Sequence, residues 1–182
     1  MTAATVYIAE SNTSAETVTN LTGTVDGRPA SCNMGSIDQP AMLISTTTAI
    51  VADDNSFEKW QRFRVTDMGT ATQIGGLRVW DSDTLAAEAT HKTNARTTGY
   101  EGAQTFDAVN GPLATDRSAT YDYTQTMPVG DPGATNLGIA GSLSSFLTGI
   151  GYSDYLVHQI QTTASAVAGK SIIINYQYFE YQ

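Results

Sequence analysis

The chain has 182 residues, of which 41% are hydrophobic, 18 are acidic and 9 are basic, giving a formal net charge of −9. A negative field of this size repels phosphate backbones and anionic lipid, so we expect neither nucleic acid nor a membrane as partner. Cys32 is the only cysteine, which excludes an internal disulfide and a thiolate-rich metal site.

The length suits a single domain over residues 1–182, and the many Thr and other β-branched residues favour strands over long helices. The opening MTAATVYIAESNTS has no basic segment followed by an apolar core, and no later run approaches the roughly 18 apolar residues of a membrane span. We therefore expect a chain that is made in a cytoplasm.

The first half of the chain is expected to form short strands. ATVYIA at 4–9 and the Thr-rich ETVTNLTGTV at 16–25 are typical of strands, and a loop rich in turn residues follows over 26–40. AMLISTTTAIV at 41–51 is apolar and β-branched enough for another strand, which the turn ADDNS ends.

The segment FEKWQRFRVTDMGTATQIGGLRVW at 57–80 predicts a hairpin with an unusual outer face. Alternation places Phe57, Phe63 and Val65 on one face of its first strand and Trp60, Arg62 and Arg64 on the other. In the return strand the pair Gly75 and Gly76 predicts a bulge, after which Leu77 and Val79 face inward. The two strands would then present one aromatic and basic surface, made of Trp60, Arg62, Arg64, Arg78 and Trp80.

Residues 81–150 are expected to form a loop-rich insertion. SDTLAAEATHK at 82–92 has the composition of a short helix with Ser82 as N-cap. NLGIAGSLSSFLTGIGYSD at 136–154 is rich in small residues and predicts an ordered excursion rather than a long helix. Long ordered loops are where partner contacts tend to occur.

The chain ends in two strong strand signals, DYLVHQIQTTAS and SIIINYQYFEYQ. The second is apolar on both faces, which predicts burial on both sides, in the middle of a sheet or against a neighbouring subunit. The faces are Ile172, Ile174, Tyr176 and Tyr178 on one side and Ile173, Phe179 and Tyr181 on the other. Together these elements predict an all-β protein, an antiparallel β-sandwich of jelly-roll type with at most one short helix.

Several catalytic and ion-binding patterns are incomplete. AVAGKS at 166–171 lacks the first glycine of a phosphate loop, because that position is Ala164, and a strand follows it instead of a helix. Asp81, Asp83 and Glu88 suggest a calcium loop, but Ala86 and Lys92 occupy its glycine and final carboxylate positions. A looser calcium site made of loop carboxylates stays open.

The histidines offer no recognisable centre. His91 and His158 lie far apart and lack the spacing of a zinc pair. Ser153, Asp154 and His158 have no nucleophile elbow, and alternation places Ser153 and His158 on opposite faces. A carboxylate pair for glycoside hydrolysis stays open, although no two carboxylates are singled out. We expect no enzyme activity, no cofactor and no metal, and interpret His158 as a satisfied strand residue.

The predicted aromatic and basic surface has three interpretations. The arginines could pair with acids across strands while a tryptophan fills the core. Alternatively the residues form a protein interface, since Trp and Arg most often anchor one. The rings could also stack on sugars.

Two segments resemble virion structural proteins of tailed bacteriophages: NSFEKWQRFRVTDMGTATQIGGLRVW and GYSDYLVHQIQTTASAVAGKSIIINYQYFEYQ. The features in common with those proteins are an aromatic and basic strand, a following strand with Ile, Leu and Trp, and a Tyr-rich last strand. The resemblance covers about a third of the chain. It implies a β-sandwich on a virus particle, a capsid decoration or cement protein that binds the major capsid protein or other virion proteins.

The expected location is therefore the capsid surface, after synthesis in the host bacterial cytoplasm. Proteins of this kind are often homo-oligomers, and a trimer is the expected form. A tail or fibre component, or a carbohydrate-binding module for host recognition, is the alternative.

Overall fold

The computed structural model describes residues 2–13, 15–21, 24–25, 28–29, 34–38, 49–96, 99–100, 125–167 and 174–182. All regular structure in these ranges is β-strand, which confirms the all-β prediction. No helix in the described ranges has the length and apolar character needed to cross a membrane.

The larger sheet has β5 (Lys59–Asp67) at its centre, between β1 (Thr5–Asn12) and β10 (Tyr155–Thr162), with all pairings antiparallel. Beyond β1 lies β2 (Thr17–Asn20), and beyond β10 lie β7 (Ala89–Arg96) and β8 (Gln125–Thr126). The two-residue strand β9 (Gly151–Tyr152) pairs with β5 beside Arg64 and Val65. The alternation in YLVHQIQT thus produces the expected strand, β10.

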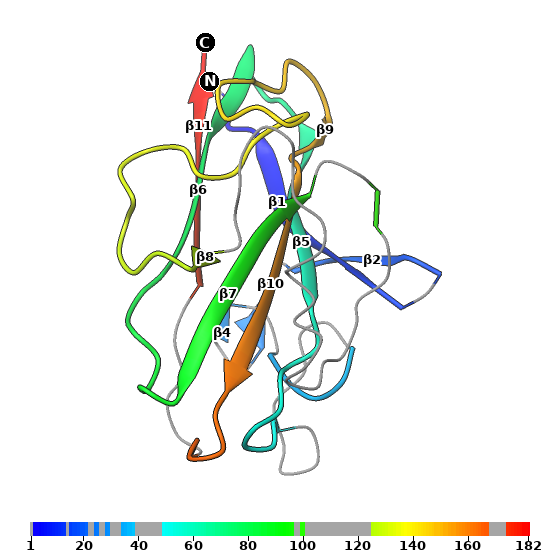
Figure 1. The fold of residues 1–182 in the computed structure, drawn as a ribbon. Coiled ribbons are helices and arrows are strands. Elements are labelled where there is room, and N and C mark those ends of the chain that lie inside the picture. The colour runs from blue at the N-terminus through cyan, green and yellow to red at the C-terminus, as the bar shows by residue number, and fades with distance from the viewer. Residues whose placement is uncertain are drawn as a thin grey trace.

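The second sheet consists of β6 (Gln73–Asp81) and the C-terminal strand β11 (Ile174–Tyr181), which run antiparallel. Figure 1 shows these two strands side by side, with β1, β5, β7 and β10 forming a separate layer. A short pair, β3 (Thr24–Val25) and β4 (Arg28–Pro29), completes the described strands.

The core lies between the two sheets, because the inward faces of both contribute to one hydrophobic cluster. Its buried members come from strands of both sheets and from the segment after β8: Phe63, Leu77, Val79, Ala95, Met127, Leu137, Ile139 and Leu156. Tyr176 and Tyr178 of β11 pack against this cluster. The fold is therefore sandwich-like, as expected, while the jelly-roll order of strands remains a prediction.

The position of β11 differs from the prediction. It pairs with β6 alone among the described strands, and its outward side chains Phe179 and Tyr181 are 40% and 42% exposed. The expected place in the middle of a sheet is wrong, because among the described strands β6 is the single neighbour of β11. Residues Ile172 and Ile173 lie outside the described residues.

Two further expectations change. The helix predicted over 82–92 is wrong: residues 82–88 form an irregular segment that ends in a turn at 87–88, and Ala89 begins β7. In the predicted strand at 41–51, residues 49–51 are not in a strand and 41–48 lie outside the described residues. The segment 136–154 is an ordered excursion, as expected, apart from the short β9 and isolated bridges.

The predicted bulge at Gly75 and Gly76 is present as a register shift opposite Gln177 and Phe179. Gly76 has φ of 62°, a left-handed conformation that favours glycine. A Cβ at Gly75 would approach the Phe146 ring to 2.5 Å, and one at Gly76 would approach the Phe179 ring to 2.7 Å. The absence of side chains at these two glycines thus allows two exposed aromatic rings to pack directly against the backbone of β6.

Candidate functional site

The five residues predicted to share one surface are divided between two sheets. Residues 57–80 do not form a hairpin, because β5 pairs with β1, β9 and β10 whereas β6 pairs with β11. Phe63 of β5 and Leu77 of β6 both face the common core, so the alternate side chains of the two strands point away from it on different layers. The prediction of a single aromatic and basic surface is wrong for this geometric reason.

Trp60 lies in a small core of its own on the outer side of the larger sheet. It is 1% exposed and contacts Tyr155 and Tyr100 edge to face, at ring separations of 5.4 and 5.3 Å. Its indole N–H donates to Glu58 at 3.0 Å. Trp60 is therefore a packing residue. This agrees with the interpretation in which a tryptophan fills the core.

Arg62 and Arg64 remain on the outer face of the larger sheet. The Arg62 guanidinium lies 3.8 Å from the centre of the Tyr152 ring and 4.3 Å from that of Tyr155. Arg64 donates to Asn20 at 3.2 Å and lies 5.7 Å from the Tyr152 ring. We call Arg62, Arg64 and Tyr152 the arginine face.

The only acid paired with Arg62 in the described part of the chain is Glu16, at 3.7 Å. No hydrogen bond from Arg62 is found among the described residues, and Tyr152 is 37% exposed. Glu16 also accepts a hydrogen bond from the Tyr155 hydroxyl at 2.8 Å. Burial is the main cause that raises the pKa of Tyr155 to about 12; Glu16 raises the pKa as well, whereas the Ser11 hydrogen bond and the Arg62 charge lower it. This hydroxyl therefore stays protonated at neutral pH.

Arg78 and Trp80 extend from β6, in the other sheet. Arg78 holds the Asp131 carboxylate with two contacts of 2.7 and 2.9 Å and lies 4.9 Å from the Phe179 ring centre. Trp80 is half-buried. For Arg78 the interpretation as a residue paired with an acid is therefore confirmed.

Sequence reasoning missed the most unusual feature of the molecule, a network of polar side chains buried between the sheets. The Glu10 carboxylate accepts hydrogen bonds from the Lys59 ammonium at 3.1 Å, the Gln61 amide at 2.7 Å and the Asn12 amide at 2.9 Å. Glu10, Lys59 and Gln61 are all 0% exposed. The Asn12 amide also donates to Asp38 at 2.7 Å, which links the network to the segment before residue 39.

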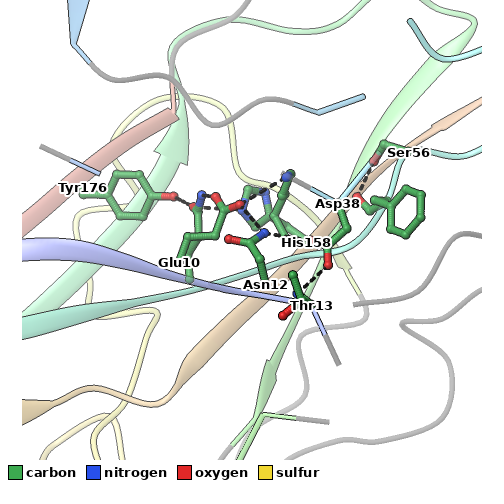
Figure 2. A network of polar contacts seen from close by, with 10 residues as sticks. Glu10, Asn12, Thr13, Asp38, Ser56, His158 and Tyr176 are labelled. Carbon is green, nitrogen blue, oxygen red and sulfur yellow. Dashed lines mark hydrogen bonds and ion pairs between the residues drawn. The ribbon is translucent and has the colours of Figure 1, made fainter. Parts of the chain in front are cut away.

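Both histidines belong to this network, although they are 67 residues apart. His91 on β7 contacts His158 on β10 through Nε2 and Nδ1 at 2.8 Å. The other nitrogen of His91 lies 2.8 Å from the Asp81 carboxylate, and that of His158 lies 2.9 Å from Gln61 Oε1. The Tyr176 hydroxyl of β11 also donates to Gln61 Oε1. Figure 2 shows Tyr176, Glu10 and His158 directed toward one another from separate strands.

Burial lowers the pKa of His158 well below its ordinary value, and the nearby His91 and Lys59 lower it further. His158 is thus a satisfied strand residue, as interpreted. The expectation that the two histidines are unrelated is wrong, because neighbouring strands β7 and β10 bring them together. One signal could have revealed the network: extending the alternation of β5 places Lys59 and Gln61 on the same inward face as Phe63.

The incomplete motifs form no site in the described residues. Asp81 contacts His91 at 2.8 Å, and Asp83 accepts from the backbone N–H of Thr84 at 2.7 Å. The Ser153 hydroxyl accepts from the Phe63 backbone N–H and donates to the Asp154 carbonyl rather than to His158. Within the described ranges no group of three potential ligands is arranged to hold a metal ion. Gly169, Lys170 and Ser171 lie outside the described residues.

Comparisons of the chain with protein-family models, with curated proteins and with solved structures find no match.

Proposed function

We propose that this protein is a structural virion component of a tailed bacteriophage, a capsid decoration or cement protein that binds the outer surface of the head. The observation that supports this role best is the arginine face, where the Arg62 guanidinium lies against two tyrosine rings on the outside of the larger sheet. Such contact restrains a long side chain before a partner arrives, which lowers the entropy cost of binding.

The chemistry of the arginine face favours an acidic protein partner. Arg62 and Arg64 lie next to one another on a molecule with net charge −9, so they form a local cationic surface that would attract carboxylates of a partner. Guanidinium groups suit this task because their planar donors match the geometry of carboxylates. The partner we propose is the major capsid protein, with an adjacent copy of this chain as a further neighbour in a homo-oligomer.

An enzymatic role has less support. The ionisable side chains that gather into one group are those of the buried network, and Glu10, Lys59, His91 and His158 are no more than 2% exposed. A catalytic group must come within hydrogen-bond reach of its substrate. These side chains are held in the core, where they contact one another.

The alternative is a tail or fibre component that binds sugar through exposed rings. Phe146 and Tyr181 are 41% and 42% exposed and lie 5.3 Å apart on the outer side of the smaller sheet. Their planes meet at 87°, whereas stacking on one sugar face requires rings that lie flat side by side. The observed geometry favours the capsid role.

The test is co-sedimentation with intact phage capsids, comparing the wild type, the double variant Arg62→Ala with Arg64→Ala, and the matched control Arg78→Ala. We expect saturable binding of the wild type, at least tenfold weaker binding of the double variant, and little change for Arg78→Ala, because Arg78 is already paired with Asp131 on the other sheet. A glycan-retention assay runs in parallel.

Two outcomes would contradict the proposal. Equal binding by the wild type and the double variant would remove the arginine face as the contact surface. Failure to bind capsids, combined with glycan retention that survives high salt, would place the protein among host-recognition appendages.

A further inference from the structure

In the buried network, the contacts starting from Glu10 determine which atom donates and which accepts at each hydrogen bond. The Gln61 amide nitrogen lies 2.7 Å from Glu10 Oε2, and a carboxylate can only accept. The reverse orientation of the amide would place two acceptors in contact, because this carboxylate forms an ion pair with the Lys59 ammonium at 3.1 Å. Gln61 therefore points its Oε1, an acceptor, toward His158.

This orientation determines the tautomer of His158. Its Nε2 lies 2.9 Å from Gln61 Oε1 and must carry the hydrogen, since the amide oxygen has none to give. The Tyr176 hydroxyl fills the second acceptor position of the same oxygen. A neutral His158 with a hydrogen on Nε2 leaves Nδ1 bare, so Nδ1 accepts.

The bare Nδ1 of His158 in turn requires a donor, which is His91 Nε2 at 2.8 Å. The remaining nitrogen of His91 faces both oxygens of Asp81, at 2.8 and 3.0 Å, and this contact also needs a hydrogen. Asp81 and His91 are both 2% exposed, so this contact satisfies two buried polar side chains.

The network joins the two sheets at both of its ends. Asp81 lies on β6 and Tyr176 on β11, the strands of the smaller sheet, while His91, His158 and Gln61 lie on β7, β10 and β5 of the larger one. We infer that the hydrogen-bonded chain from Asp81 through His91, His158 and Gln61 to Tyr176 is a proton-dependent lock between the sheets, which opens when His158 gains a proton.

The lock opens because a second proton on His158 disrupts its contact with His91. A hydrogen on His158 Nδ1 would face the N–H of His91, so donor would meet donor at the 2.8 Å contact. The charged groups that face His158 are His91 from β7 and Lys59 from β5, both of which oppose a further positive charge. Beyond them lie Glu10 from β1, already held by Lys59, and Asp81 from β6, already held by His91.

The pH dependence follows from the lowered pKa of His158. The unfolded chain binds a proton there with the ordinary pKa of 6.5, whereas the folded chain resists it, so stability is lost as the pH falls below that value. The chain has two histidines, and carboxyl groups titrate mainly below about pH 5, so the interval between about 5 and 6.5 reports the histidines.

The first test is nitrogen NMR of the histidine rings in the unmodified protein at neutral pH, which distinguishes protonated from bare ring nitrogens. We expect His158 to carry its hydrogen on Nε2 with Nδ1 bare, and His91 to carry a hydrogen on Nε2. A bare Nε2 on either ring would reverse the direction of the network and overturn the inference.

The second test measures urea unfolding of the wild type from about pH 7.5 to about pH 5. Below pH 6.5 the folding equilibrium constant should fall, approaching tenfold per pH unit for one proton. Tyr176→Phe is the matched control, because it removes the hydroxyl contact and leaves both histidines, so the slope should persist.

His158→Gln should remove the slope, provided that the variant folds. The result on the wild type decides the question even if that variant does not fold. A wild-type folding constant that stays flat over the interval would overturn the inference.

Discussion

At the scale of single residues, Lys59 illustrates how strongly one buried charge depends on its partner. Its ammonium and the Glu10 carboxylate are both 0% exposed and lie 3.1 Å apart. Lys59→Met leaves Glu10 without its cation inside the core, which should lower the free energy of unfolding by about 3–5 kcal/mol. Urea denaturation followed by circular dichroism would measure the loss.

The control is a double-mutant cycle with Glu10→Gln. Because the second change removes the unpaired carboxylate, Lys59→Met with Glu10→Gln should be less destabilised than Lys59→Met alone. A double variant that loses the sum of the two single effects would mean that the pair contributes no coupling.

At the scale of elements, β11 tests the assignment of faces in the smaller sheet. Tyr178 packs against the core, while its neighbour Phe179 points outward and is 40% exposed. Tyr178→Ala should cost about 2–3 kcal/mol of unfolding free energy, and Phe179→Ala less than about 1 kcal/mol. Thermal or urea unfolding of the two variants supplies the comparison, and equal losses would contradict the observed facing of the strand.

The elements also show how far local sequence patterns reach. Alternation in residues 59–67 predicts that strand and its inward residues Phe63 and Val65 correctly, since period 2 reflects which face is buried. The strand at 155–162 is also predicted correctly. The same pattern cannot say which strand is the neighbour. Residues 57–80 resemble a hairpin, yet β6 pairs with β11 after a long separation in sequence. Strand pairing is decided by the whole core rather than by the connecting turn.

Local sequence patterns likewise predict only part of the candidate sites. The sequence identifies Arg62 and Arg64 as outward residues, because each alternates with a buried neighbour. The buried network joins residues from six strands, and no spacing within one segment encodes the contact between His91 and His158. The helix-like composition of residues 82–92 led to a helix being predicted where His91 lies on a strand. Pairing of β7 with β10 outweighs this weak local propensity.

At the scale of the whole molecule, the tryptophans provide one probe in each sheet: Trp60 lies on β5 and Trp80 on β6. Trp60→Phe leaves a fluorophore only in the smaller sheet, and Trp80→Phe leaves one only in the larger sheet. If the shared core and the network couple the sheets, the fluorescence and far-UV circular dichroism transitions of each variant should coincide at pH 7.5. Fluorescence of Trp80 that changes at lower urea than the circular dichroism signal would show that the sheets unfold separately.

The pairing of β6 with β11 also affects how the chain is made. About 90 residues separate Asp81 from Ile174, so a ribosome working at roughly 5–20 residues per second needs roughly 5–20 s to supply the partner strand. During that interval the edge of β6 and the apolar side chains of Leu77 and Val79 have no β11 to cover them. Every newly synthesised copy thus passes through a period in which it can pair with another copy, and chaperone binding to nascent β6 would protect it.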